Sequence, residues 1–176
     1  MEFTKKERFM IANQFRILEL LEPAQAQEYA KTREIFEEGY ENECEWAMEH
    51  IDSGLSSDIQ KQVCDTLDMF VAIRRNYGQL TDKIGIEPNE ILFDGYDGND
   101  PQEVKMLGYA RFLVEKEGKF TDVKKGQDGH WNFNSHGERI ENYERMLAEW
   151  DQMGRNQILS KDQIANLLNA SNHPRS

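Results

Sequence analysis

The sequence predicts an all-α, multihelical protein in which an N-terminal helical hairpin precedes a larger helical part. Residues 57–80 carry apolar or small side chains in steps of three and four, the period of a helix. Several segments begin with a Ser, Thr or Asp that is followed three residues later by Glu or Gln, which is typical of a helix N-terminus. Residues 1–77 contain two glycines and residues 78–137 contain nine, so long helices are expected before a turn-rich region.

The hairpin region is predicted over residues 1–54. Thr4 and Glu7 have the spacing of a capping box, and the helix that they open runs to about Leu21. Pro23 suits the first turn of the second helix, because the amide that proline lacks has no partner in that turn. Gly39 suits the left-handed residue that ends this helix. A third apolar stripe follows before Gly54, and its opposite face is acidic.

The larger part is predicted over residues 55–170 and is organised around the helix 57–80. This helix begins at Ser56 or Ser57, and its apolar side chains cover more than half of its circumference, so it must be covered on most sides. The run Ile91-Leu92-Phe93 is too short to classify and fits either a strand or a buried turn.

A fifth helix is predicted to follow Asp100, which would cap it, with Pro101 as its first residue and Glu103 closing the capping box. Gly108, in the middle of this helix, predicts a close crossing with another helix, because glycine there costs about 1 kcal/mol relative to alanine. Gly118 is expected to end the helix.

Residues 119–134 are the one segment for which β structure is predicted. Two short runs flank a turn-rich hexapeptide, and Phe120, Trp131 and Phe133 supply an apolar side, so the segment fits a small β-hairpin. An irregular loop packed by the same aromatic side chains fits the pattern too.

Two more helices are predicted near the end of the chain. Ser135 and Glu138 have capping-box spacing before the first of them. Ser160 and Gln163 have the same spacing before the second, and the residues around them also fit a hydrophobic staple. Residues 171–176 are expected to form a flexible tail.

Composition restricts the classes of function. The net charge is −12, and residues 22–68 hold thirteen acidic and three basic side chains. An acidic surface repels phosphate backbones, which makes nucleic acid an unlikely partner. No apolar run approaches the ~18 residues of a membrane span, so no membrane partner is expected. Cys44 and Cys64 fall on apolar helix faces and no signal peptide is recognised, which together predict a cytoplasmic protein.

No strong catalytic, cofactor-binding or metal-binding motif is present, and no residue is assigned to these roles. The weak candidate is a polar cluster in the glycine-rich region that comprises Tyr109, Arg111, His130, Asn134 and His136. Two histidines six residues apart could bind a metal together with Asp128, so a metal-assisted hydrolase using His130, His136 and a carboxylate is one alternative. Turn and capping roles for the same side chains are the simpler interpretation.

The basic region 111–125 offers a second alternative. Its five cations and three anions leave a local charge of +2, which stands out against the acidic background. On a loop or hairpin these lysines could lie against a nucleic-acid backbone, but so small an excess would give weak, salt-sensitive binding.

The chain also resembles a known family. Asn13-Gln14-Phe15, Leu21-Glu22-Pro23, Gly108-Tyr109-Ala110-Arg111-Phe112, Phe133-Asn134-Ser135-His136, Tyr143-Glu144-Arg145-Met146-Leu147 and the final Leu159-Ser160 with Ile164 are similar to strings of the YfbU family and occur in the same order. This is a family of small bacterial proteins without an assigned biochemical activity. The resemblance covers roughly residues 3–170 and implies a mainly α-helical, oligomeric protein, with no catalytic residues to carry over. The region 121–132 is longer and more basic than the family pattern.

The sequence therefore predicts a helical, homo-oligomeric interaction or regulatory protein without catalytic activity. Several apolar side chains exceed what one narrow stripe per helix would bury: Met10, Ile17, Leu20, Trp46 and Met48. Such positions favour self-association, or a protein partner, as the means of covering them.

Overall fold

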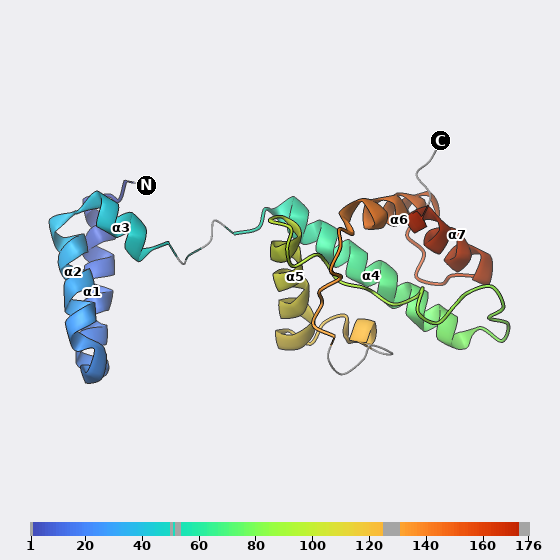
Figure 1. Cartoon of the computed structure of the whole chain (residues 1–176), viewed down its shortest axis with the longest axis horizontal. Coiled ribbons are helices and arrows are strands. Elements are labelled where there is room, and N and C mark those ends of the chain that lie inside the picture. The colour runs from blue at the N-terminus through green and yellow to red at the C-terminus, as the bar shows by residue number, and fades with distance from the viewer. Residues whose placement is uncertain (1, 50, 52–53, 125–130, 173–176) are drawn as a thin grey trace. The chain divides into compact units, whose positions relative to one another are not determined.

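Seven α-helices dominate the computed structural model, which describes residues 2–49, 51, 54–124 and 131–172 (Figure 1). The described residues contain no β-strand, so the predicted all-α, multihelical fold is confirmed. The chain divides into two units, Met1–Gly54 and Leu55–Ser176. None of the helices in the described part of the chain is both long and apolar enough to cross a membrane.

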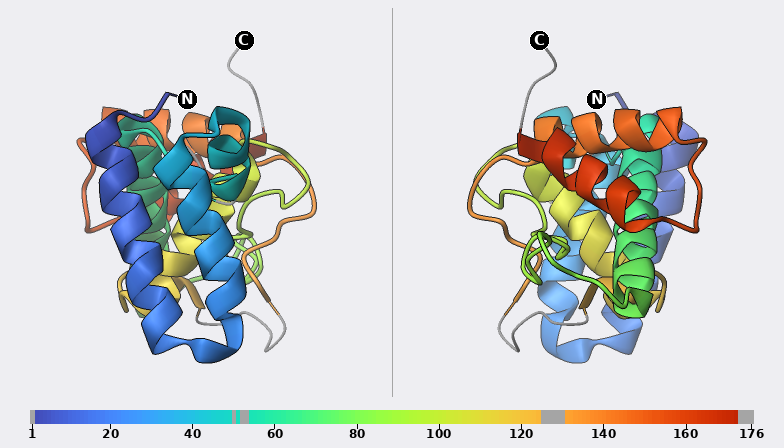
Figure 2. Two further views of the ribbon diagram at one scale, coloured as in Figure 1. Left: turned by 90° about the vertical axis from the view of Figure 1, so that its left-hand side faces the viewer. Right: turned by 90° about the vertical axis from the view of Figure 1, so that its right-hand side faces the viewer.

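The first unit is a helical hairpin followed by a short helix. Helix α1 (Lys5–Leu21) and helix α2 (Ala26–Glu38) lie antiparallel and are joined by a 3-10 turn that begins at Pro23 (Figure 2). Both sides of the predicted Thr4–Glu7 capping box are present, and Gly39 ends α2 with a φ of 76°. Helix α3 (Glu41–Ala47) follows directly.

This first unit has a small core. Four hydrophobic residues are buried in it, and they come from all three helices: Ala12, Ile35, Phe36 and Cys44. Phe15 of α1 stacks on Phe36 with ring centroids 6.1 Å apart. Arg33 links the two long helices by pairing with Glu19 of α1 and Glu37 of α2, both at 2.6 Å.

The second unit is built around helix α4 (Ser57–Gln79), nine of whose residues are buried. Ser56 caps α4 by accepting a hydrogen bond from the amide of Ile59, which decides between the two predicted starts. Helix α5 (Glu103–Arg111) continues into a π-helical turn, Phe112–Lys116, after which Gly118 adopts a φ of 65°. Helices α6 (Ile140–Gln152) and α7 (Lys161–Asn172) lie side by side (Figure 2).

Phe93 lies at the centre of the core of the second unit, although it belongs to an irregular segment. Its ring is fully buried and lies 5.4 Å from Phe70 of α4 and 5.6 Å from Tyr143 of α6, measured between ring centroids. Trp131 contacts the same ring edge-on at 6.1 Å. The run Ile91-Leu92-Phe93 is therefore a buried turn, and its aromatic contacts connect the loop to two helices.

The predicted β-hairpin at 119–134 is wrong for the residues that the structure describes. Residues Thr121–Lys124 form a 3-10 helix, and residues 125–130 lie outside the described part of the chain. The second arm pairs with a distant segment: the amide of Tyr96 donates to the carbonyl of Phe133 at 2.9 Å, and the amide of Ser135 donates to the carbonyl of Tyr96 at 3.1 Å. These bonds form one isolated parallel bridge.

Three local predictions are also corrected. A Cβ atom added at Gly108 would meet no atom of another segment within 4 Å, so no helix of the described residues crosses closely there. Helix α6 begins at Ile140 without a side-chain cap from its own N-terminal segment, so the predicted Ser135–Glu138 box is wrong. Helix α7 continues to Asn172, so the first two residues of the predicted tail are helical, and residues 173–176 lie outside the described part of the chain. The predicted Ser160–Gln163 capping box of α7 is present.

Candidate functional sites

Two side chains of the predicted polar cluster, Asn134 and Arg111, make local hydrogen bonds. Asn134 organises the turn around it, because its Oδ1 accepts hydrogen bonds from the amides of Gly98, at 3.1 Å, and His136, at 2.9 Å. Arg111 donates from Nη2 to the carbonyl of Asn132 at 2.5 Å. The structure thus brings Asn134 and His136 together through the backbone of the turn, and no hydrogen bond between their side chains occurs in the described residues.

Tyr109 belongs to a different environment. It is half-buried on α5, and its phenol lies beside the thiol of Cys64 on α4. Burial, and then the neighbouring thiol, raise the pKa of this phenol. His130 and Asp128 lie outside the described residues, and the residues that are described contain no group of three His, Cys, Asp or Glu side chains that could hold a metal ion. The hydrolase alternative gains no supporting contact from this geometry.

Two of the five cations of the basic region pair with acidic side chains of the same region. Lys124 pairs with Glu115 and Lys119 with Glu117, both at 3.4 Å. From α4, Arg75 pairs with Asp122 at 2.7 Å. Lys119 and Lys124 thus already have carboxylate partners, and no contact in the described residues adds support to the phosphate-binding alternative.

Glu103 is a buried carboxylate that sequence reasoning placed in the wrong role. Its residue is 1% exposed, and its Oε2 accepts from the amide of Asp97 at 2.6 Å. Its Oε1 accepts from the amides of Arg139, at 2.7 Å, and Ile140, at 2.9 Å, at the start of α6. Two of the free amides of α6 are thus satisfied by a side chain from α5, where a negative charge is also favoured by the helix dipole. Glu103 therefore links the start of α5 to the turn six residues before it and to the start of α6, which is more than thirty residues away.

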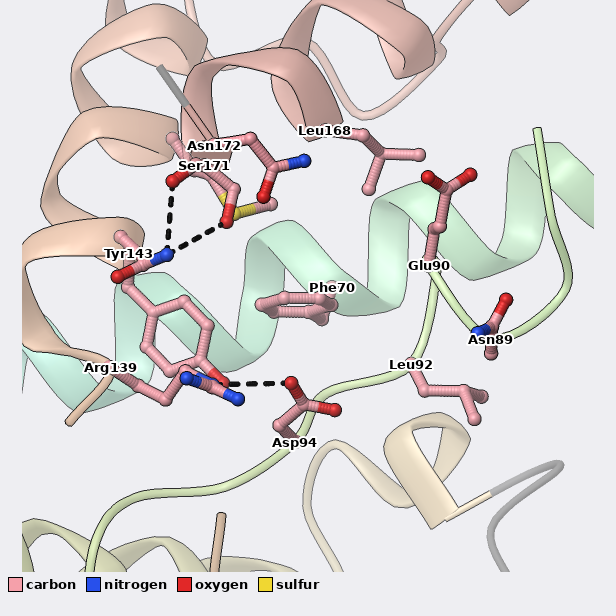
Figure 3. A pocket seen from close by; sticks show the side chains of 12 residues that line it. Phe70, Asn89, Glu90, Leu92, Asp94, Arg139, Tyr143, Leu168, Ser171 and Asn172 are labelled. Atoms are coloured by element: carbon pink, nitrogen blue, oxygen red, sulfur yellow. Dashed lines mark hydrogen bonds and ion pairs between the residues drawn. The ribbon is translucent and has the colours of Figure 1, made fainter. Parts of the chain in front are cut away.

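A polar pocket of about 220 Å³ lies between α6, the end of α7 and the segment 89–94 (Figure 3). Phe70, Leu168 and Met146 supply apolar side chains to its lining. Its polar groups are bonded to one another: Arg139 pairs with Asp94 at 3.2 Å, and Nδ2 of Asn142 donates to the Ser171 carbonyl at 3.0 Å.

Tyr143, which also lines this pocket, donates its hydroxyl to the carbonyl of Gly95 at 3.0 Å. Burial is the main cause that raises the pKa of this phenol, and the carboxylate of Asp94 adds to the effect. The phenol therefore stays protonated at neutral pH and serves as a hydrogen-bond donor within the fold.

The first unit exposes an apolar face on α1. Five large apolar side chains of this helix are between 48% and 79% exposed: Phe9, Met10, Ile17, Leu20 and Leu21. At 100° per residue they lie within about a third of the circumference, on the side of the helix opposite to Ala12 and Phe15, which pack toward α2. Helix α1 therefore has two apolar faces, of which the hairpin buries one; we call the other the outer face of α1.

A groove of about 600 Å³ lies on another side of the same unit, between α2 and α3. Its walls are mostly apolar and include Tyr29, Ile35 and Trp46, and Trp46 itself is 71% exposed. Among the described residues of the first unit, more large apolar side chains are therefore exposed than buried.

The fold and these surfaces define a two-unit, all-helical protein whose N-terminal hairpin presents apolar side chains and whose second unit encloses an aromatic core. The chain belongs to the YfbU family, because the family's YfbU domain matches residues 1–170. This match confirms the resemblance that the sequence motifs indicated.

Proposed function

We propose that this protein acts by association, with itself and with other proteins, and that the outer face of α1 is the main surface through which it associates. The observation that carries the proposal is the arrangement of α1, which is apolar on two opposite sides and buries only the side toward α2. Soluble proteins rarely expose so many large apolar side chains together unless another surface covers them.

The size of the first unit supports the same proposal. A unit of about fifty residues buries too little surface to be very stable by itself, and here four hydrophobic residues make up its buried core. Each large apolar side chain that passes from water into an interface contributes about 1.5–3 kcal/mol. Burial of the five outer-face side chains would therefore offset much of the roughly 4–15 kcal/mol that association costs in lost freedom.

The cytoplasm is the compartment that we propose. Both cysteines are free thiols, Cys44 being buried and Cys64 half-buried, as is typical of proteins in a reducing environment. The buried Cys44 thiol has its pKa raised, mainly by burial, so it is kept in its unreactive protonated form.

Molar mass in solution tests the proposal. Light scattering on the full chain at micromolar concentration is expected to give a multiple of 20.6 kDa. Ile17→Glu places a charge in the outer face and is expected to weaken association at least about 100-fold, because a charge that lacks a partner is costly to bury. Gln27→Glu, at an exposed position of α2, is the matched control and should leave the mass unchanged. A molar mass of 20.6 kDa at micromolar concentration, which is that of a monomer, would contradict the proposal.

A further inference from the structure

We infer that the outer face of α1 is covered by α1 of a second copy, and that the two helices pair antiparallel about a two-fold axis at Asn13. The inference rests on the proposed function, since it names the partner and the geometry of the association. A second copy is the occupant that the pattern of α1 favours, because the outer face is complementary to itself when one helix is reversed.

The spacing of side chains about Asn13 shows this self-complementarity. Phe9 and Ile17 stand four residues to either side of Asn13, and Lys6 and Leu20 stand seven residues to either side. Positions separated by four and seven residues share one face of a helix. An antiparallel pair centred on Asn13 therefore sets Phe9 against Ile17 of the partner, and Lys6 against the partner's Leu20, twice each, as a two-fold interface requires.

The long apolar stem of Lys6 suits its place in this arrangement. It can lie along the partner's leucine while its ammonium group reaches water beyond the helix. The two Phe9–Ile17 contacts would then form the apolar centre of the interface on both sides of the axis.

Charge along α1 favours the antiparallel orientation. The first turn holds three basic side chains and one acidic side chain: Lys5, Lys6, Glu7 and Arg8. The exposed Glu22 follows the C-terminus of the helix. This C-terminus is also the negative end of the helix dipole. An antiparallel pair places each basic end beside an acidic end, whereas a parallel pair would place like charges together. Surface charges of this kind set orientation more than affinity.

Asn13 has the properties of a residue that fixes register. It lies in the middle of an apolar stripe, is half-buried, and its side chain makes no hydrogen bond within the described part of the chain. On a two-fold axis, each of two facing amides can donate one hydrogen bond to the other and accept one in return. A shifted register would set the amide against an apolar side chain, and a single polar residue at such a position is known to specify register and oligomeric state.

Disulfide cross-linking of the full chain distinguishes the possible pairings. A cysteine at position 13 faces its own copy across the axis, so Asn13→Cys is expected to cross-link under mild oxidation. Positions 6 and 20 are fourteen residues apart, about 21 Å along a helix. Since a disulfide joins Cα atoms less than about 7 Å apart, Lys6→Cys and Leu20→Cys should each fail to cross-link alone and should cross-link when mixed. The unchanged chain, which carries only Cys44 and Cys64, is the control.

The outcomes separate this inference from the proposed function. If Lys6→Cys or Leu20→Cys cross-links with itself and the mixture does not, the pair is parallel and the inference is overturned. If the protein is oligomeric but Asn13→Cys does not cross-link, a different surface joins the copies, and association stands without this geometry. If the chain is monomeric at micromolar concentration, no second copy covers the outer face of α1, and both proposals fail.

Discussion

Replacing Glu103 by glutamine changes one atom of a buried side chain and should strongly destabilise the second unit. The carboxylate accepts three backbone hydrogen bonds, one at Oε2 and two at Oε1. A glutamine amide has only one acceptor oxygen, so at best it keeps the two bonds at the start of α6 and turns its NH2 group toward the amide of Asp97. An unsatisfied buried donor costs about 1–3 kcal/mol, and each retained bond loses the strength that the charge gave it, about 1 kcal/mol. We expect Glu103→Gln to lower the free energy of unfolding by about 3 kcal/mol, after allowing for the charge that no longer has to be buried.

The assay is urea unfolding followed by tryptophan fluorescence. Two of the three tryptophans, Trp131 and Trp150, belong to the second unit, so a Trp46→Phe background makes the signal specific for that unit. Glu138→Gln is the control: this exposed residue precedes Arg139, and the change removes the same charge without removing a buried hydrogen bond. It should change the free energy of unfolding by less than about 0.5 kcal/mol. If the two variants unfold at the same urea concentration with the same slope, the three hydrogen bonds do not contribute as the geometry requires.

Two other predictions concern the same part of the fold. Gly95→Ala should cost at least about 3 kcal/mol, because Gly95 has a φ of 101° and an added Cβ would lie 2.0 Å from the carbonyl oxygen of Phe133. Gly85→Ala, at a φ of 85° but with open space around it, should cost only about 1–2 kcal/mol in the same urea assay, and equal losses would show that the contact is irrelevant. The raised pKa values of Tyr96 and Tyr143, both due mainly to burial, predict alkaline instability. Above about pH 10 the unfolded chain releases these protons, whereas the folded chain retains them. The contribution of each buried phenol to the free energy of unfolding is therefore fully present below pH 10 and falls by about 1.4 kcal/mol per pH unit above it. Tyr143→Phe should remove one such slope from a plot of unfolding free energy against pH, and an unchanged slope would contradict the assignment.

Much of the first unit follows from local sequence. The Thr4–Glu7 capping box, the end of α1 at Leu21 and the left-handed Gly39 are contacts within one or two helical turns, and all three are confirmed. The same holds for Ser160 and Gln163 at the start of α7. Local rules succeed in these places because the donor and the acceptor are only a few residues apart, so the spacing of residue types contains the information.

Glu103 shows where local reasoning fails. Its spacing from Asp100 is that of a capping box, and Asp100 does accept from the amide of Glu103 at 2.7 Å. The reciprocal bond is missing, because the Glu103 side chain turns inward to amides that lie six residues before it and more than thirty residues after it. The predicted Ser135–Glu138 box is wrong for the same reason, because the amides at the start of α6 donate to the distant carboxylate of Glu103. The spacing of residues within one segment cannot predict a hydrogen-bond partner that comes from a distant segment.

Sequence patterns were enough to predict that the chain is helical, where α1, α4 and α7 begin, and that α1 carries more apolar side chains than one face can bury. These properties depend on periodicity and on capping, which act over a few residues. Three features follow from tertiary contacts: Phe93 of an irregular segment is the centre of the aromatic core, the second arm of the predicted hairpin pairs with Tyr96, and Glu103 joins α5 to α6. Each of these depends on which distant segments meet, and which of the two apolar faces of α1 is exposed depends on the side on which α2 packs.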